Sequence, residues 1–292
     1  MASLKDVKVK ISGVKKTKQI TKAMNMVASA KLRGAQQRIE RFRPYAQKFF
    51  DMLSDLGGQS EEAAHPLLAR RDEVKTVGIL LATSDRGLCG SFNVNIISDA
   101  LKIATAKTSE GKTVKFYCVG KKARDAVRKL GYEIPLAAVG QLNSFDFQLA
   151  ASVGQRVMDD FQAGQLDEVV MVYGEFVSLA RQVPVSLPIL PIAAAGTDEG
   201  EKKEPAKEYI YEPAVEGLLA ELLPRFVKVQ IYRGLLDTSA SEHAARMLAM
   251  DNATRNCDDM TRALTLLYNK TRQAAITTEL IDIVGGVEAL KG

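Results

Sequence analysis

A seven-residue hydrophobic repeat runs from Leu4 to Leu56. Thirteen of its sixteen seam positions are apolar, and a seam kept over so many repeats predicts a long helix that pairs with another helix. The polar exceptions are three consecutive seam positions: Lys18, Thr21 and Asn25. Near them the apolar ridge is expected to shift to three neighbouring residues: Ile20, Met24 and Val27.

Proline and glycine predict where this N-terminal helix bends and ends. Pro44 should bend it, because proline removes a backbone donor and clashes with the preceding turn. Gly57-Gly58 should end it. With a rise of about 1.5 Å per residue, the helix would span roughly 80 Å, more than the width of a small domain.

A second long helix is expected from about Pro213 to Val284, with an interruption at Pro224 and an end at Gly285-Gly286. Its seam is expected at ten positions: Met250, Ala253, Cys257, Met260, Leu264, Leu267, Thr271, Ala274, Thr278 and Ile281. Farther upstream the repeat is less regular and includes three polar residues: Ser239, His243 and Arg246.

Each long helix carries an apolar stripe that needs a partner, and the other long helix, paired antiparallel, is the simplest one. Small seam residues would let the two backbones approach closely. These small residues are Ala28, Ala35, Ala253 and Ala274.

Between the two long helices the periodicity changes, and short apolar runs alternate with amphipathic segments. Strands are expected at about 75–82, 112–120, 167–178 and 182–192, and helices at about 93–107, 121–131 and 143–164. This alternation predicts a mixed or mostly parallel sheet with helices on its faces. The last strand contains Pro184, Pro188 and Pro191, so it should lie at an edge or become a loop.

The expected fold class is therefore α/β plus long helices. An antiparallel two-helix coiled coil is expected from the N-terminal helix (1–57) and the C-terminal helix (208–286). A Rossmann-like α/β domain (74–195) would be inserted between them, followed by a polar surface loop or hinge.

Charge is concentrated at one end of the chain. The net charge is +5 overall, but residues 1–50 contain 13 Lys/Arg and only 2 Asp/Glu, a net of +11, so the remainder carries −6. A basic segment of this kind indicates a local interaction surface. A mitochondrial transit peptide is the less favoured explanation, because the helical pattern continues past fifty residues without a cleavage-like break.

The remaining composition argues against most site chemistries. The three cysteines are scattered and there are only two histidines, so neither a disulfide framework nor a metal site is expected, and no cofactor. No apolar run approaches the roughly 20 residues of a membrane span, so membrane association would require a partner.

The segment Ser84–Gly90, "SDRGLCG", follows a strand and precedes a helix, where phosphate-binding loops occur. It matches neither GxGxxG nor GxxxxGK[ST], so a structural turn is favoured over a nucleotide site. No Ser/His/Asp, Cys/His or paired-carboxylate arrangement stands out, so the sequence predicts that the chain on its own is not an enzyme. The basic helix could also bind DNA, but apolar residues interleave its charges on nearly all sides, which favours an acidic protein partner.

Five segments resemble the gamma subunit of F-type ATP synthase, bacterial type, in the right order and at the right spacing. They are "ITKAMNMVASAKLR" (20–33), "SDRGLCGSFN" (84–93), "YIYEP" (209–213), "SEHAARMLAMDNAT" (241–254) and "YNKTRQAAITTELIDIVGG" (268–286). The resemblance implies the central rotor shaft, without a catalytic site, inside a ring of alpha and beta subunits. It also implies an epsilon subunit and a membrane ring of c subunits as partners, and no nucleic acid.

The resemblance also implies roles for individual residues. Beta-subunit contacts are implied for Lys22, Met24, Met26, Lys31, Arg33, Arg272, Gln273, Thr277 and Glu279. An apolar bearing tip is implied for Ile281, Val284 and Val287, and contacts with the c ring for Tyr209, Tyr211 and Glu212. The chain lacks the paired-cysteine insert of the chloroplast type, so thiol regulation is not expected. The expected location is the cytoplasmic side of a bacterial inner membrane, as a peripheral protein.

Overall fold

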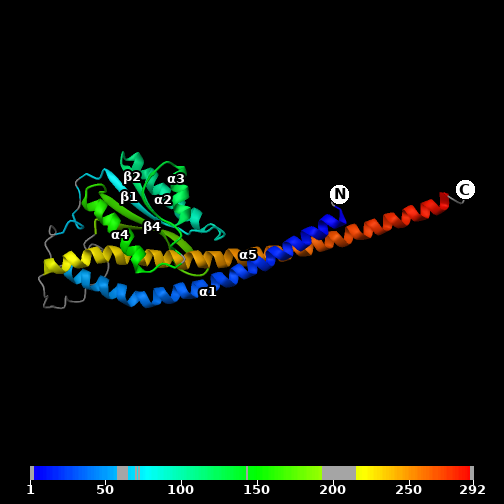
Figure 1. The fold of residues 1–292 in the computed structure, drawn as a ribbon, viewed down its shortest axis with the longest axis horizontal. Coiled ribbons are helices and arrows are strands. Elements are labelled where there is room, and N and C mark those ends of the chain that lie inside the picture. Colours follow the sequence, from blue (N-terminus) through cyan, green and yellow to red (C-terminus); the bar gives the residue numbers. More distant parts are fainter. Residues whose placement is uncertain are drawn as a thin grey trace. The chain divides into compact units, whose positions relative to one another are not determined.

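The computed structural model describes residues 3–57, 65–69, 71, 73–142, 144–192 and 215–289 (Figure 1). Its elements are α1 (Leu4–Gly57), β1 (Thr76–Ala82), α2 (Phe92–Ser109), β2 (Thr113–Val119), α3 (Lys121–Lys129), β3 (Glu133–Ala138), α4 (Phe147–Gln162), β4 (Glu168–Phe176), β5 (Gln182–Leu190) and α5 (Val215–Ala289). They form two compact units, one of residues up to Ala28 with those from Met247 onward, the other of Ser29–Arg246.

The second unit contains a five-stranded sheet in the order β3-β2-β1-β4-β5. The first four strands are parallel, and β5 runs antiparallel to β4 at one edge. This confirms the expected mixed sheet and the edge position of the proline-containing strand. The strand β3 was not expected, because Pro135 interrupts its short apolar run; the register between β2 and β3 shifts at that point, as an edge position allows.

Both faces of the sheet are buried, and successive residues of β1 divide between them. Leu80 belongs to a core shared with α4, α5 and α1. Ile79 and Leu81 belong to a core shared with α2 and α3. Helices on both faces explain why β1 reads as a continuous apolar run rather than as an alternating one.

Within the second unit, α5 is buried on nearly all sides between α1 and the sheet. Phe42 of α1 meets Tyr232 of α5 edge to face with ring centroids 4.9 Å apart, and Phe50 meets Phe226 at 5.2 Å. The α1 number rises as the α5 number falls, so the two helices run antiparallel here.

Two expected helix boundaries were wrong. The helix α5 passes through Pro224 without interruption and through Gly285-Gly286 to Ala289. Leu223 and Val227, beside the proline, are buried in the core, and that burial outweighs one lost hydrogen bond. The two glycines weaken the helix by about 1 kcal/mol each, but this cost does not by itself end a helix.

The expected ridge shift in α1 was also wrong. Thr21 is buried, and Lys18 and Asn25 are half-buried, so the polar residues stay in the seam. Ile20 and Val27 are instead exposed. The apolar pattern alone could not show that these polar residues have partners on α5.

In α5 the expected seam holds through Cys257, and beyond it Leu264 and Thr271 are half-buried as expected, but the alternate seam positions move by one residue. Met260 and Leu267 are exposed, whereas the next residues in the chain, Thr261 and Tyr268, are half-buried. The small residue Ala274 is exposed and Ala275 is half-buried. Met260 and Leu267 are the more apolar members of the first two pairs, so the apolar pattern favoured the residue that the structure exposes.

Candidate functional site

The helix pair of the first unit is closed by polar contacts between α1 and α5. Lys18 forms an ion pair with Asp258, and the hydroxyl groups of Thr21 and Thr254 lie 2.8 Å apart. The Asn25 side chain, in turn, donates a hydrogen bond of 2.8 Å to the backbone carbonyl of Met247. Polar pairs inside an apolar seam fix the register of two helices, because sliding would leave them unpaired.

The outward side of α1 in the same unit has a different character. Ile20, Met26 and Val27 are each more than half exposed, and Met24 is half-buried. Lys22 is exposed beside them, without a hydrogen bond or ion pair among the described residues. Large apolar side chains gathered on one exposed helix surface are typical of interaction sites.

Two further residues with implied beta contacts lie on α1 in the second unit. Lys31 and Arg33 are both exposed. Lys31 is not free, however, since it interacts within the chain, and its charge helps to hold the pKa of buried His243 below the usual value.

The C-terminal part of α5 continues beyond α1. Because Lys18 faces Asp258 and the helices are antiparallel, the start of α1 at Leu4 falls opposite roughly residue 272. From Ile276 onward every described residue with an assigned burial is exposed. Arg272, Gln273, Thr277 and Glu279 are also exposed, and the Thr277 hydroxyl donates to the carbonyl of Gln273 on its own helix.

The exposed tip of α5 carries six large apolar side chains. With about 100° between successive residues, they occupy an arc of roughly 160° around the helix. They are Ile276, Leu280, Ile281, Ile283, Val284 and Val287. The implied bearing residues thus share one side of the helix with three further apolar residues. The implied c-ring residues Tyr209, Tyr211 and Glu212 lie outside the described residues.

The loop Ser84–Gly90 is held by bonds within the chain. Asn93 accepts hydrogen bonds from the backbone and hydroxyl of Ser84 at 3.0 and 2.9 Å. One carboxylate oxygen of Asp85 accepts from the backbone amides of Lys121 and Gly140 at 2.9 and 2.8 Å. Asp85 therefore occupies the N-terminus of α3, where an anion would otherwise bind.

Strand order reverses at β1, and the crevice at the carboxyl ends of β1 and β4 is where open α/β sheets bind ligands. Here α5 reaches both strand ends. Ser241 donates a hydrogen bond of 3.0 Å to the carbonyl of Gly174, and Arg246 donates one of 3.2 Å to the carbonyl of Gly87. The structural-turn interpretation of the loop is therefore favoured over the nucleotide site.

Sequence reasoning missed the buried polar cluster on α5. Ser241, Glu242 and His243 are all nearly fully buried, and Glu242 forms an ion pair of 2.7 Å with Arg246. Burial raises the pKa of Glu242, and Arg246 opposes the rise. The only signal in the sequence was the polar residues within the seam frame of the second helix.

Other chemistries find little support in the part of the chain that the structure describes. It contains no cluster of three or more His, Cys, Asp or Glu side chains suited to a metal ion. None of its helices is long and apolar enough to cross a membrane. Burial raises the pKa of the Cys118 thiol to about 12 and raises that of Cys89, so neither thiol is reactive at neutral pH.

Solved structures share the fold. A chain of the Euglena gracilis mitochondrial ATP synthase is similar with a TM-score of 0.67 and 21% identity, over 98% of this chain and 94% of that one. A chain of the Tetrahymena thermophila mitochondrial ATP synthase is similar with a TM-score of 0.59 and 24% identity, over 80% of this chain and 99% of that one.

Sequence comparison identifies the family. The family model described as ATP synthase matches residues 3–290. An "ATP synthase gamma chain" of Nitratidesulfovibrio vulgaris is 73% identical over the whole length of both chains, and one of Maridesulfovibrio salexigens is 66% identical, also over the whole length of both. The chain therefore belongs to the gamma-chain family of ATP synthase.

Proposed function

We propose that the chain is the central rotor shaft of an F-type ATP synthase. It couples ion-driven rotation of the membrane c ring to ATP synthesis or hydrolysis at the alpha/beta catalytic sites, and it has no catalytic site of its own. The observation that carries the proposal is the helix pair of the first unit, where the seam is bonded within the chain while the outward side exposes apolar residues beside Lys22.

The shaft is an antiparallel coiled coil of α1 and α5, with a Rossmann-like α/β domain inserted between residues 1–57 and 208–286. Two observations support this arrangement. Every seam position of α1 from Leu4 to Phe49 is buried or half-buried. The contacts between α1 and α5 run antiparallel in each of the two units.

The outward side of the shaft meets acidic loops of the beta subunits. Lys22, Met24, Met26, Lys31 and Arg33 supply the positive and apolar counterpart. Charge attraction acts over a distance of about 10 Å and requires little geometric specificity. It therefore keeps partners in contact while the shaft turns to a new angle.

The two ends of the shaft serve different partners. Arg272, Gln273, Thr277 and Glu279 contact beta subunits, and the apolar arc that includes Ile281, Val284 and Val287 turns inside an apolar collar. At the other end, Tyr209, Tyr211 and Glu212 meet the c ring, and the α/β domain meets the epsilon subunit. The complex holds the chain at the cytoplasmic side of a bacterial inner membrane.

A charge placed at Met24 tests the beta contact. Met24→Lys adds a cation next to acidic partner loops, so we expect altered coupling between rotation and catalysis rather than unfolding. The measurement is proton pumping per ATP hydrolysed in vesicles that hold the reconstituted complex. Met52→Lys is the matched control, since Met52 lies on α1, is also partly exposed and has no assigned contact. Equal coupling in both variants would argue against the assigned role of Met24.

Reconstitution tests the shaft role itself. The purified chain should show no ATPase activity, yet it should restore assembly of an alpha/beta ring that lacks it. Failure to co-purify with that ring would contradict the proposal. Salt-sensitive binding of the chain to duplex DNA, with a steep dependence on salt concentration, would instead favour the nucleic-acid alternative.

A further inference from the structure

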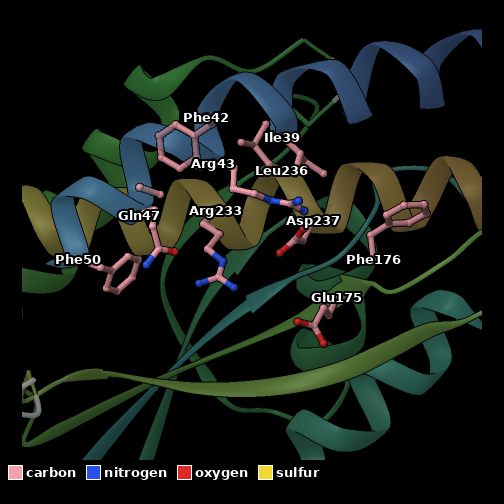
Figure 2. Close-up of a pocket in the computed structure, with 11 residues that line it drawn as sticks. Ile39, Phe42, Arg43, Gln47, Phe50, Glu175, Phe176, Arg233, Leu236 and Asp237 are labelled. Atoms are coloured by element: carbon pink, nitrogen blue, oxygen red, sulfur yellow. The ribbon is translucent and has the colours of Figure 1, made fainter. Parts of the chain in front are cut away.

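A cavity of about 230 Å³ lies between α1, α5 and the end of β4 in the second unit (Figure 2). One part of its wall is aromatic and aliphatic. Four charged side chains also line it: Arg43 from α1, Arg233 and Asp237 from α5, and Glu175 from β4. None of the four forms an ion pair within 4.0 Å among the described residues.

Asp237 lies against β4 because α5 approaches the strand closely at Gly234. A Cβ atom at Gly234 would lie 2.5 Å from the methyl carbon of Met171 and 3.4 Å from the ring of Tyr173, so a larger residue could not fit there without movement. Asp237 follows almost one turn later, and Figure 2 shows its carboxylate on the side of α5 that faces β4, with Glu175 on the strand opposite.

We propose that this cavity is a proton-sensitive contact, in which Asp237 takes up a proton and the packing of α5 on β4 is tighter when it does. A neutral carboxyl group loses less hydration on burial than a carboxylate does. Protonation also removes the repulsion between Asp237 and Glu175. The contact belongs to the folded chain and does not depend on the proposed shaft role.

The charges around Asp237 support this inference. Burial raises its pKa from the usual 3.8 to about 6; the arginines Arg233 and Arg43 oppose the rise, and Glu175 adds to it. Tyr173 also interacts with Asp237, Arg233 and Glu175. Its own pKa is raised to about 12, mainly by burial, so it stays neutral over the same range.

The pKa of Asp237 is higher in the folded chain than in the unfolded one, so protonation of this group stabilises the fold. The contribution of Asp237 to stability is fully present below about pH 4 and is lost as the pH rises through 6. With 3.8 for the unfolded chain and about 6 for the folded one, the folding equilibrium constant falls about tenfold from pH 5 to pH 8 on account of this group.

The test must separate Asp237 from His243, which shifts in the opposite sense. Burial, together with Arg246, Lys31 and Arg38, lowers the pKa of His243 to about 4, so His243 favours folding at higher pH. The folding equilibrium constant of the full chain is therefore measured by urea unfolding, for wild type and for Asp237→Asn at each pH. Hydrogen exchange of the β4 amides gives a second, local measurement. Both proteins retain His243, and its contribution cancels.

We expect the ratio of the two folding constants, wild type over Asp237→Asn, to fall about tenfold from pH 5 to pH 8. Asp259→Asn is the matched control, because the Asp259 side chain is 74% exposed, and its ratio should stay constant. Glu175→Gln should move the transition of Asp237 to lower pH. A constant ratio for Asp237→Asn would overturn the proposal. If that variant does not fold, an unshifted transition in Glu175→Gln would do so.

Discussion

Removal of Arg246 should destabilise the second unit, because it leaves the buried carboxylate of Glu242 without a counter-charge. The side chains of Arg246 and Glu242 are only 11% and 4% exposed, and their ion pair of 2.7 Å lies one helical turn apart on α5. Arg246→Met keeps most of the volume and the helix propensity of the side chain but leaves Glu242 without its counter-charge.

Breaking one side of a buried ion pair costs about 3–5 kcal/mol, because the remaining charge is neither hydrated nor paired. The lost bonds to the carbonyls of Gly87 and Arg86, 3.2 and 3.5 Å long, add little, since both lie in a loop at the surface. We therefore expect a loss of about 3–5 kcal/mol at pH 8. The loss should be smaller at pH 5, because burial has already raised the pKa of Glu242 and the unpaired carboxyl can take up a proton.

The double variant Glu242→Gln, Arg246→Met is the control that isolates the charge. It removes both charges, so much of the stability lost in Arg246→Met should return. The free energy of unfolding in urea, measured at pH 5 and pH 8 for the three proteins, gives the comparison. Equal stability of the single and double variants at pH 8, or a loss in Arg246→Met independent of pH, would refute the reasoning.

Two further predictions concern the helix pair and the buried histidine. Ala35 is fully buried on α1, so Ala35→Leu should overpack the seam and lower the free energy of unfolding by about 1–3 kcal/mol. Gly34→Ala should not lower it, because a Cβ atom added at Gly34 would meet no other side chain or element within 4 Å. His243 should stay neutral down to about pH 5, because burial lowers its pKa to about 4. The stability it provides is then lost as the pH falls from 6.5 towards 4, and imidazole resonances that titrate near pH 6.5 would contradict this assignment.

The sequence was sufficient for features that depend on a long, regular pattern. Apolar runs such as Thr76–Ala82 predicted the buried parallel strands, and the seven-residue repeat predicted the buried side of α1 from Leu4 to Phe49. Each conclusion depends on many residues that agree, so single exceptions do not change it.

The errors arose where a local signal competed with a distant contact. Pro224 predicted a break, but the apolar residues around it are buried against other elements. Lys18 and Asn25 predicted a loosened seam, but their partners Asp258 and Met247 lie more than two hundred residues later in the chain. A single sequence does not show which distant residues will meet, so it could not reveal that these polar positions are paired.

Two groups of polar residues on α1 in the first unit therefore behave in opposite ways. Those in the seam have fixed partners, and sliding α1 along α5 would break the Thr21–Thr254 and Lys18–Asp258 contacts. Lys22, on the outward side, has no hydrogen bond or ion pair among the described residues. A shaft that turns within a ring needs both properties, because an internal slip would dissipate torque, while fixed bonds to the ring would have to break at each step. The hydrophobic repeat alone does not show which polar residue belongs to which group. The distinction depends on which polar side chains meet a partner within the chain, and this is the feature of the structure that best fits the proposed rotor.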